Sequence, residues 1–226
     1  MIDKLEAQLR PPATELPPYP PKFIMLASGE KMVIRQAKRE EVPFLLEVIR
    51  PLISVERDFY DLVAARMYAE LLGWYRYRVK DEYCIVGAID GVVAGIVNGR
   101  SMNPDQGMSY HTIAIKRGLR VGGQLFAAKM EYHIEIIGHK EVFIVAESPI
   151  GFRRWILEFT LEPRPEVWHE LGGVPTYVLT DKLWYQHKAR LVAGRRPVPE
   201  DLLKTSKNLK LPSEYSQLQY QKGGKT

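Results

Sequence analysis

The sequence from Ser109 to Glu147 reads SYHTIAIKRGLRVGGQLFAAKMEYHIEIIGHKEVFIVAE. Tyr110–Lys116 combines aromatic, β-branched and small residues, which predicts a central strand covered on both faces. Glu141–Ala146 predicts a second apolar strand. Between them, apolar residues recur at helical spacing from a start near Gly122 to an end at Gly138. The residues on this helix face are Phe126, Met130, Ile134 and Ile137.

The loop between the first strand and the helix, residues 116–123, reads KRGLRVGG. Its glycines let the backbone turn tightly and approach a ligand, and its cationic side chains favour a negatively charged one. The free amides and the positive dipole end of a helix start add to this preference. The loop therefore predicts a phosphate or pyrophosphate site, with a tight turn bearing solvated arginines as the alternative. Its spacing matches neither the dinucleotide fingerprint nor a P-loop.

Arg117–Gly122 resembles the acyl-CoA pyrophosphate loop of the GNAT acetyltransferase superfamily, written Arg/Gln-x-x-Gly-x-Gly/Ala. Arg117 takes the first position and Gly122 the last, while Arg120 stands where the middle glycine is usual. The resemblance implies that the preceding strand pairs with the pantetheine of acetyl-CoA and that the loop amides hold the pyrophosphate. The residues it implies for binding acetyl-CoA or coenzyme A are Ile113, Ala114, Ile115, Arg117, Gly118, Leu119, Arg120, Val121, Gly122, Gly123 and Gln124.

The residues before this stretch predict a strand, two helices and a β-hairpin. The strand is Lys31–Ala37, the helices are Glu40–Ile53 and Asp58–Leu72, and the hairpin strands Tyr83–Ile89 and Val92–Gly99 flank an Asp-Gly turn. Pro51 indicates an early end to the first helix, and Gly73 is expected to close the second. The resulting order is that of the GNAT fold, over residues 32–180. We therefore expect an α/β protein (α+β, mixed sheet), with a central mixed β-sheet flanked by helices.

After Glu147 the chain predicts a helix over Pro149–Leu161, a break at 162–165, a resumed helix over Glu166–Leu171 and a strand over Pro175–Thr180. Residues 149–165 are interpreted as an insertion near the acceptor site. Residues 168–173, WHELGG, are similar to the family's Tyr-x-x-Leu-Gly-Phe helix end. Trp168 then stands where many members keep the tyrosine that protonates the leaving thiolate.

Acetyl transfer to an amine requires a base for the ammonium proton, and an acid or solvent for the departing thiolate. The candidates for the base are His111, on the strand before the loop, and Glu147, at the end of the next strand. A structural histidine and a surface carboxylate or loop cap are the alternatives. Tyr177 is a candidate acid, and so is His169, which lies beside the substituted tyrosine position.

The remaining histidines and the aromatic residues suggest less chemistry. His133 and His139 are expected at the surface or as caps, and the five histidines show no metal-ligand spacing, so no metal site is expected. Four aromatic residues form either a rim for the acceptor or part of the core. They are Tyr60, Tyr68, Trp74 and Tyr75.

The two ends differ in composition from the predicted acyltransferase domain, residues 31–181. Residues 1–30 form an N-terminal extension whose segment 11–22 carries six prolines. We interpret this segment as a stiff arm that binds a proline-reading domain or lies on the protein's own surface or a partner subunit. Residues 182–226 hold ten lysines and arginines against three acidic residues. A solvated extension, or one packed on a neighbouring subunit, is favoured, since no nucleic-acid motif is present.

The composition suits a cytoplasmic protein. The lone Cys84 excludes an intramolecular disulfide and lies in an apolar run, which predicts a buried thiol. No apolar run reaches the length of a membrane span, and the N-terminus does not resemble a signal peptide. No membrane or nucleic-acid partner is expected.

The sequence thus leads to two hypotheses. The first is an acyl-CoA-dependent N-acetyltransferase that transfers an acetyl group to a small-molecule or protein amine. The second is a catalytically inactive GNAT-like protein that binds coenzyme A or serves as a scaffold. Arg120, Trp168 and both unusual termini motivate the second hypothesis. A homodimer built by exchange of terminal segments fits either one.

Overall fold

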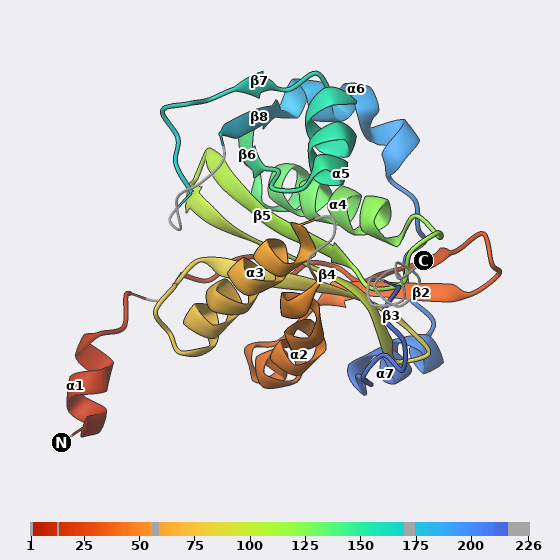
Figure 1. The fold of residues 1–226 in the computed structure, drawn as a ribbon, viewed down its shortest axis with the longest axis horizontal. Coiled ribbons are helices and arrows are strands. Elements are labelled where there is room, and N and C mark those ends of the chain that lie inside the picture. Colours follow the sequence, from red (N-terminus) through yellow and green to blue (C-terminus); the bar gives the residue numbers. More distant parts are fainter. Residues whose placement is uncertain (1, 13, 56–58, 170–174, 217–226) are drawn as a thin grey trace, which may run out of the picture.

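The computed structural model describes residues 2–12, 14–55, 59–169 and 175–216, which form one mixed sheet covered by helices on both faces (Figure 1). The strand order is β1-β2-β3-β4-β5-β6-β8-β7, and all neighbours are antiparallel except β5 and β6. The strands are β1 (Lys22–Met25), β2 (Lys31–Gln36), β3 (Glu82–Ile89), β4 (Val92–Asn103), β5 (Gln106–Ala114), β6 (Glu141–Val145), β7 (Glu162–Pro163) and β8 (Thr176–Thr180).

Helices α2 and α3 cover one face of the sheet, and α4 and α6 lie on the other (Figure 1). Short 3-10 turns, η1 and η2, flank α2, while α4 and α5 continue into the π-helical turns η4 and η5. The α-helices are α1 (Ile2–Gln8), α2 (Val42–Ile49), α3 (Tyr60–Tyr75), α4 (Val121–Glu131), α5 (Pro149–Gly151), α6 (Asp181–Leu191) and α7 (Glu200–Lys207). The turns are η1 (Arg39–Glu41), η2 (Arg50–Ser54), η4 (Tyr132–Ile137) and η5 (Phe152–Leu157).

The predicted order of strand, two helices, three strands, helix and strand is confirmed as β2, α2, α3, β3, β4, β5, α4 and β6. The early end of α2 before Pro51 and the buried Cys84 are confirmed as well. Two details were wrong: Gly73 lies inside α3, and residues 166–169 are not helical. Residues 170–174, which complete that predicted helix, lie outside the described residues. The sequence analysis did not predict the edge strands β1 and β7.

Strands β5 and β6 separate part of the way along their length. They pair in parallel over residues 106–109 of β5 and 141–144 of β6. Beyond Ser109 the loop 116–123 turns the chain into α4, and Arg120 there has a left-handed backbone, with φ of 60°. At Gly122 a Cβ would lie 3.3 Å from the Cβ of Ala114, so the helix start is closely set against β5. Gly138, with φ of 95°, ends the helical segment as predicted.

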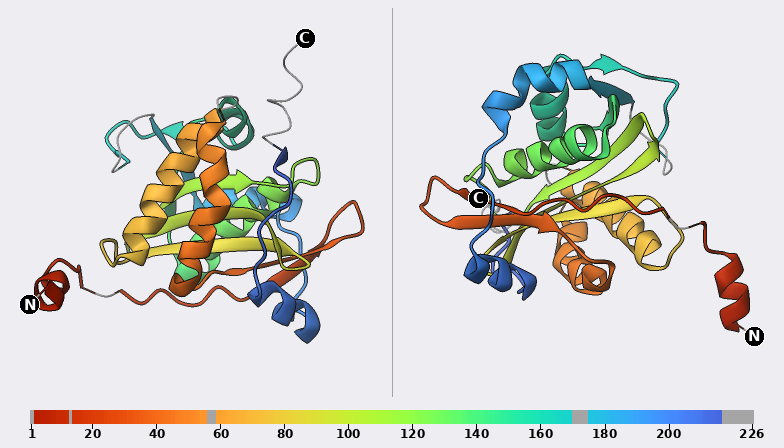
Figure 2. Two further views of the ribbon diagram at one scale, coloured as in Figure 1. Left: turned by 60° about the horizontal axis from the view of Figure 1, so that its bottom comes forward. Right: turned by 180° about the vertical axis from the view of Figure 1, so that it is seen from behind.

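Parts of both terminal segments pack on the chain's own body, whereas α1 stands apart from the sheet (Figure 1). The segment before β1 runs along the body (Figure 2), and Tyr19 in it is buried, with its hydroxyl donating to Glu131 Oε2 at 2.8 Å. In the basic segment, Trp184 is fully buried and donates from Nε1 to Glu135 at 2.8 Å. The expectation of a solvated tail is therefore incomplete for residues 182–216: most of their charged side chains are exposed, but Trp184 packs into the core. Among the described helices, none is long and apolar enough to cross a membrane.

His133 and His139 are buried, which corrects their predicted place at the surface. The hydroxyl of Tyr83 lies 2.7 Å from His133 Nε2, and the Nδ1 atoms of the two histidines are 2.9 Å apart. Burial lowers the pKa of His133 well below its ordinary value and that of His139 to about 4. Most side chains of α4 and many of its π-helical turn are buried, so the two histidines have no exposed helix face on which to lie.

Candidate active site

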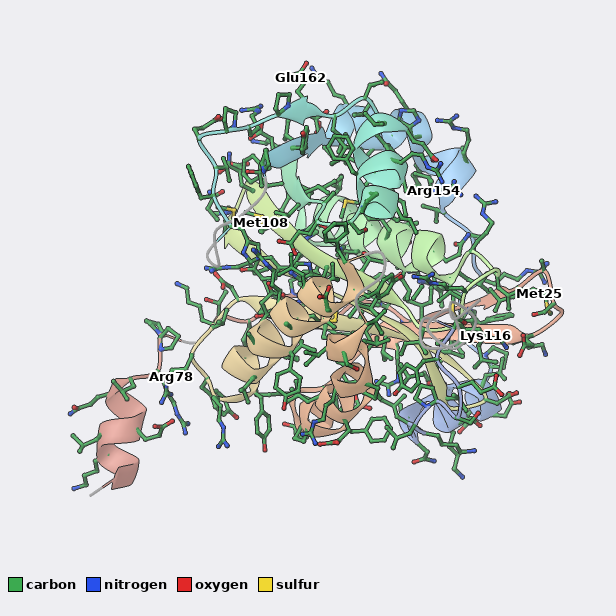
Figure 3. All side chains as sticks on the ribbon, viewed as in Figure 1. Met25, Arg78, Met108, Lys116, Arg154 and Glu162 are labelled. Carbon is green, nitrogen blue, oxygen red and sulfur yellow. The ribbon has the colours of Figure 1, made fainter. Side chains whose placement is uncertain are left out.

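A cavity of about 440 Å³ opens where β5 and β6 diverge. Its walls come from the end of β5, the loop 116–123, the start of α3, and the helical segment after β6. Four cationic residues line it, of which Figure 3 labels two, Lys116 and Arg154; the other two are Arg117 and Arg120. The cavity therefore suits a large anionic ligand.

The cations are held by different partners. Lys116 pairs with Glu30 at 2.6 Å, and Arg154 pairs with Glu158 at 3.0 Å. The guanidinium of Arg117 lies over the ring of Tyr60, 4.6 Å from its centroid. Both ion pairs are partly exposed, so water screens them and the cations stay available to an incoming anion.

Seven of the eleven residues implied for the cofactor line this cavity. Ile113 and Ile115 point instead into the core beneath α2 and α3, and Leu119 packs against the core on the other face. Gln124 does not line the cavity among the described residues. The seven are Ala114, Arg117, Gly118, Arg120, Val121, Gly122 and Gly123.

A smaller cavity of about 40 Å³ adjoins the first. The two candidate bases line it: His111 is on β5 and Glu147 follows β6. Five residues line both cavities, so the two spaces meet. The shared residues are Val63, Thr112, Ser148, Gly151 and Trp155.

The carboxylate of Glu147 can accept a hydrogen bond in this smaller cavity. Its side chain is 1% exposed, and its Oε1 lies 2.9 Å from Arg66 Nη1. Its Oε2 is 3.7 Å from His111 Nδ1, which is too long for a hydrogen bond. Neither carboxylate oxygen accepts a hydrogen bond of good geometry from the described residues. The carboxylate can therefore accept a proton donor that enters the cavity.

Glu70, on α3, connects the two histidines named as candidates. His111 Nε2 lies 3.1 Å from its Oε1, and His169 Nε2 lies 3.0 Å from the same oxygen. Its other oxygen accepts from Asn98 Nδ2 at 2.6 Å. Burial alone would raise the pKa of Glu70, but the charge of His111 and these hydrogen bonds lower it to about 2. Glu70 is therefore a buried carboxylate held in its ionised form.

Lys129, on α4, also lines the smaller cavity. Its Nζ donates to the carbonyl oxygen of His111 at 3.0 Å. Burial lowers the pKa of Lys129 to about 7, because the charged form loses its water. A large fraction of this lysine is therefore uncharged at neutral pH.

Glu70 and Lys129 were not predicted as site residues from the sequence. Val63, Met67, Glu70 and Trp74 recur at spacings of four, three and four, so Glu70 occupies a position in the apolar stripe of α3. A charged residue at an apolar position could have indicated that Glu70 is a site residue. The indication for Lys129 was weaker, because Lys129 lies beside the predicted apolar face of α4 and more of that helix is buried than this face alone.

Most of the remaining candidates lie apart from the cavities. Tyr177 stands on β8 with its ring against Phe152, and it lines neither cavity. Trp168 is 72% exposed. Tyr60 lines the larger cavity, while Trp74 is buried in the core, as the core-packing alternative predicted. Tyr68 and Tyr75 pack against the same core.

The comparisons with known proteins agree with this architecture. No family model and no curated protein sequence matches the chain. An uncharacterized protein from Bacillus halodurans has a similar structure, with a TM-score of 0.52 and 12% identity, over 77% of this chain and 97% of that one. Mycobacterium smegmatis RimJ in complex with CoA-disulfide gives a TM-score of 0.51 and 8% identity, over 76% and 95% of the two chains.

Further matched structures have lower TM-scores. One is described as a nucleotide-linked sugar GNAT, with a TM-score of 0.48 and 11% identity, and covers 80% of this chain and 100% of that one. The mixed sheet and the basic loop at the start of α4 are the features that the sequence led us to expect of this fold. The chain therefore has the fold of the GNAT acetyltransferases.

Proposed function

We propose that this protein is an N-acetyltransferase that transfers the acetyl group of acetyl-CoA to an amine. One observation carries the proposal: the larger cavity, lined by four cations and a glycine-rich helix start, meets the smaller cavity, which is lined by Glu147 and His111. The first space suits the phosphates of coenzyme A, and the second offers a proton acceptor. Together they supply the two requirements of acyl transfer, a held donor and a base.

In the proposed reaction the phosphates lie against the loop 116–123, and the thioester reaches toward the smaller cavity. The amine, once it has lost its ammonium proton to Glu147 directly or through water, attacks the thioester carbonyl carbon. A carbon–nitrogen bond forms and the carbon–sulfur bond breaks, while the nitrogen releases its second proton to solvent to give the neutral amide. Coenzyme A leaves as a thiolate that takes a proton from solvent, and Glu147 returns its proton to solvent. Since Tyr177 lines neither cavity, we assign the protonation of the thiolate to solvent.

Glu147 is the proposed base because its carboxylate is buried and has acceptor capacity in the smaller cavity. His111 is the proposed positioning residue, since its Nε2 is held by Glu70 while its Nδ1 faces Glu147. The acceptor is proposed to lie between α3 and the segment 149–165, since residues of both line the larger cavity.

The test is release of free coenzyme A thiol from acetyl-CoA in the presence of a panel of primary amines. Glu147→Gln keeps the size of the side chain but removes the base, so we expect kcat to fall by about 10²- to 10⁴-fold with little change in acetyl-CoA binding. Glu47→Gln, on an exposed part of α2, is the matched control and should keep the full rate.

Two results would count against the proposal. Equal turnover by Glu147→Gln and the unchanged protein would remove Glu147 from the role of base. Acetyl-CoA binding without transfer to any amine in the panel would favour the second hypothesis, a protein that binds coenzyme A without turnover.

A further inference from the structure

Three metal-ligating atoms meet beside the proposed base. Glu70 Oε1, His111 Nε2 and His169 Nε2 all lie within 4.8 Å of one another. The residues come from α3, from β5 and from the segment before β8, and each is at most 9% exposed. The fold thus brings two imidazoles and one carboxylate together in a buried cluster, although Glu70 and His169 are 99 residues apart in the sequence.

Two of the three separations among these atoms match those expected around a metal ion. Nitrogen and oxygen ligands of tetrahedral zinc lie about 2.0–2.2 Å from the ion, and therefore roughly 3.3 Å from one another. The two Nε2 atoms lie 3.1 and 3.0 Å from Glu70 Oε1, within a few tenths of an ångström of that separation. We propose that Glu70, His111 and His169 form a binding site for a divalent transition-metal ion, with zinc as the ion that best suits two imidazoles and a carboxylate.

The surroundings orient the proposed ligands. Asn98 Nδ2 donates to Glu70 Oε2 at 2.6 Å, which fixes the carboxylate and leaves Oε1 directed at the histidines. The ring of Tyr110 lies edge-on to that of His169, with centroids 4.9 Å apart. Such outer contacts hold ligands in place in protein metal sites.

The charges nearby are compatible with a cation. Glu70 and Glu147 lie on opposite sides of the His111 ring, and Arg66 is paired with Glu147. Lys129 is the other cation nearby, and its Nζ donates to the carbonyl oxygen of His111 at 3.0 Å.

The site goes beyond the proposed acetyl transfer and would affect it through His111. A metal on Nε2 leaves the ring proton on Nδ1, the atom that faces Glu147. His111 would then only donate toward the proposed base. Acetyl-CoA binding depends on the larger cavity, which neither Glu70 nor His169 lines, so the two proposals fail separately.

The experiment is a titration of the full chain, freed of metal by dialysis against a chelator, with Co²⁺ as a coloured substitute for zinc. We expect one equivalent to bind with visible d–d absorption bands, and Zn²⁺ to displace it. A protein that binds no stoichiometric Co²⁺ or Zn²⁺ would overturn the proposal.

His169→Gln separates a metal site from a hydrogen-bonded network. Glutamine can still donate to Glu70 but is a poor ligand, so we expect the Co²⁺ affinity to fall by more than the roughly 100-fold that loss of an outer contact produces. The metal-free melting temperature should change little. His187→Gln, on α6, is the control and should bind Co²⁺ normally. Normal Co²⁺ binding by a folded His169→Gln would overturn the proposal.

The same samples are melted with and without acetyl-CoA. Stabilisation by acetyl-CoA in a protein that binds no metal would show that only the metal proposal has failed. Loss of acetyl-CoA stabilisation with normal metal binding would show the reverse.

Discussion

The larger and the smaller cavity are assembled from the chain in different ways. Most of the larger cavity comes from two short stretches, residues 112–123 and 148–158, and its cations are partly exposed. Three titratable groups that line the smaller cavity, His111, Lys129 and Glu147, come from β5, α4 and the residues after β6, and their side chains are buried. Glu70 and Arg66 of α3 are their partners. A site made from local segments tolerates substitution, whereas a buried polar cluster leaves unpaired groups when one member is removed.

The strongest test of this contrast is Glu70→Ala. It leaves two buried imidazoles and the Asn98 amide without their shared acceptor, so we expect the free energy of unfolding to fall by about 3–5 kcal/mol. Urea denaturation at neutral pH measures the change. Glu47→Ala, in an exposed ion pair on α2, should cost less than about 1 kcal/mol. Similar losses in the two variants would remove the distinction between the regions.

The effect of Lys129→Met on the free energy of unfolding should depend on pH. The folded-state pKa of about 7 lies below the unfolded value of about 10.4, so the unfolded chain binds more protons between these limits. The destabilisation of the folded protein by buried Lys129 is therefore largest below pH 7 and decreases as the pH rises toward 10. We expect Lys129→Met to be stabilised relative to the unchanged protein at pH 7, by an amount that shrinks by up to about 1.4 kcal/mol per pH unit.

Urea denaturation of both proteins from pH 6 to pH 10 measures this difference. Lys182→Met, on the exposed side of α6, is the control and should show a difference that does not vary with pH. If the difference in free energy of unfolding between Lys129→Met and the unchanged protein also does not vary with pH, Lys129 keeps its ordinary pKa in the folded protein.

The smallest expected effect is at the exposed wall of the larger cavity. Arg154 lines that cavity and its neighbour Arg153 does not, although both are exposed. We expect Arg154→Ala to raise the Kd for coenzyme A by roughly three- to tenfold, less at high salt, and Arg153→Ala to leave it nearly unchanged. Isothermal titration calorimetry at two salt concentrations measures both. Equal effects would indicate a general charge attraction and no specific contact.

The contrast between the cavities also explains what could be predicted from the sequence. The loop 116–123 and the order of the elements depend on local patterns, and the structure confirms the order and places most of the loop at a cavity. The cluster of Glu70, His111 and His169 depends on long-range contacts, since Glu70 contacts histidines that lie 41 and 99 residues away in the sequence. No local spacing brings these residues together, so the histidine pattern alone could not predict their arrangement.

Two errors have a related cause. His133 and His139 were expected at the surface because one helix face was predicted to be buried, yet α4 lies between the sheet on one side and α6 with η5 on another. The segment after residue 181 was expected to be solvated from its charge, yet a single tryptophan, Trp184, is inserted into the core beside α4. Average composition says little about one deeply buried side chain.

The proposed reaction requires acetyl-CoA to bind in the larger cavity, and thermal unfolding with and without acetyl-CoA measures this binding. At about 100 times its Kd the ligand should stabilise the protein by roughly 2.7 kcal/mol. A Cβ at Gly123 meets no atom within 4 Å, so Gly123→Trp should fold but fill the cavity, and Gly123→Ala is the matched small control. We predict a raised melting temperature for the unchanged protein and Gly123→Ala and none for Gly123→Trp; no rise at millimolar ligand, or an equal rise in all three, would contradict binding in this cavity.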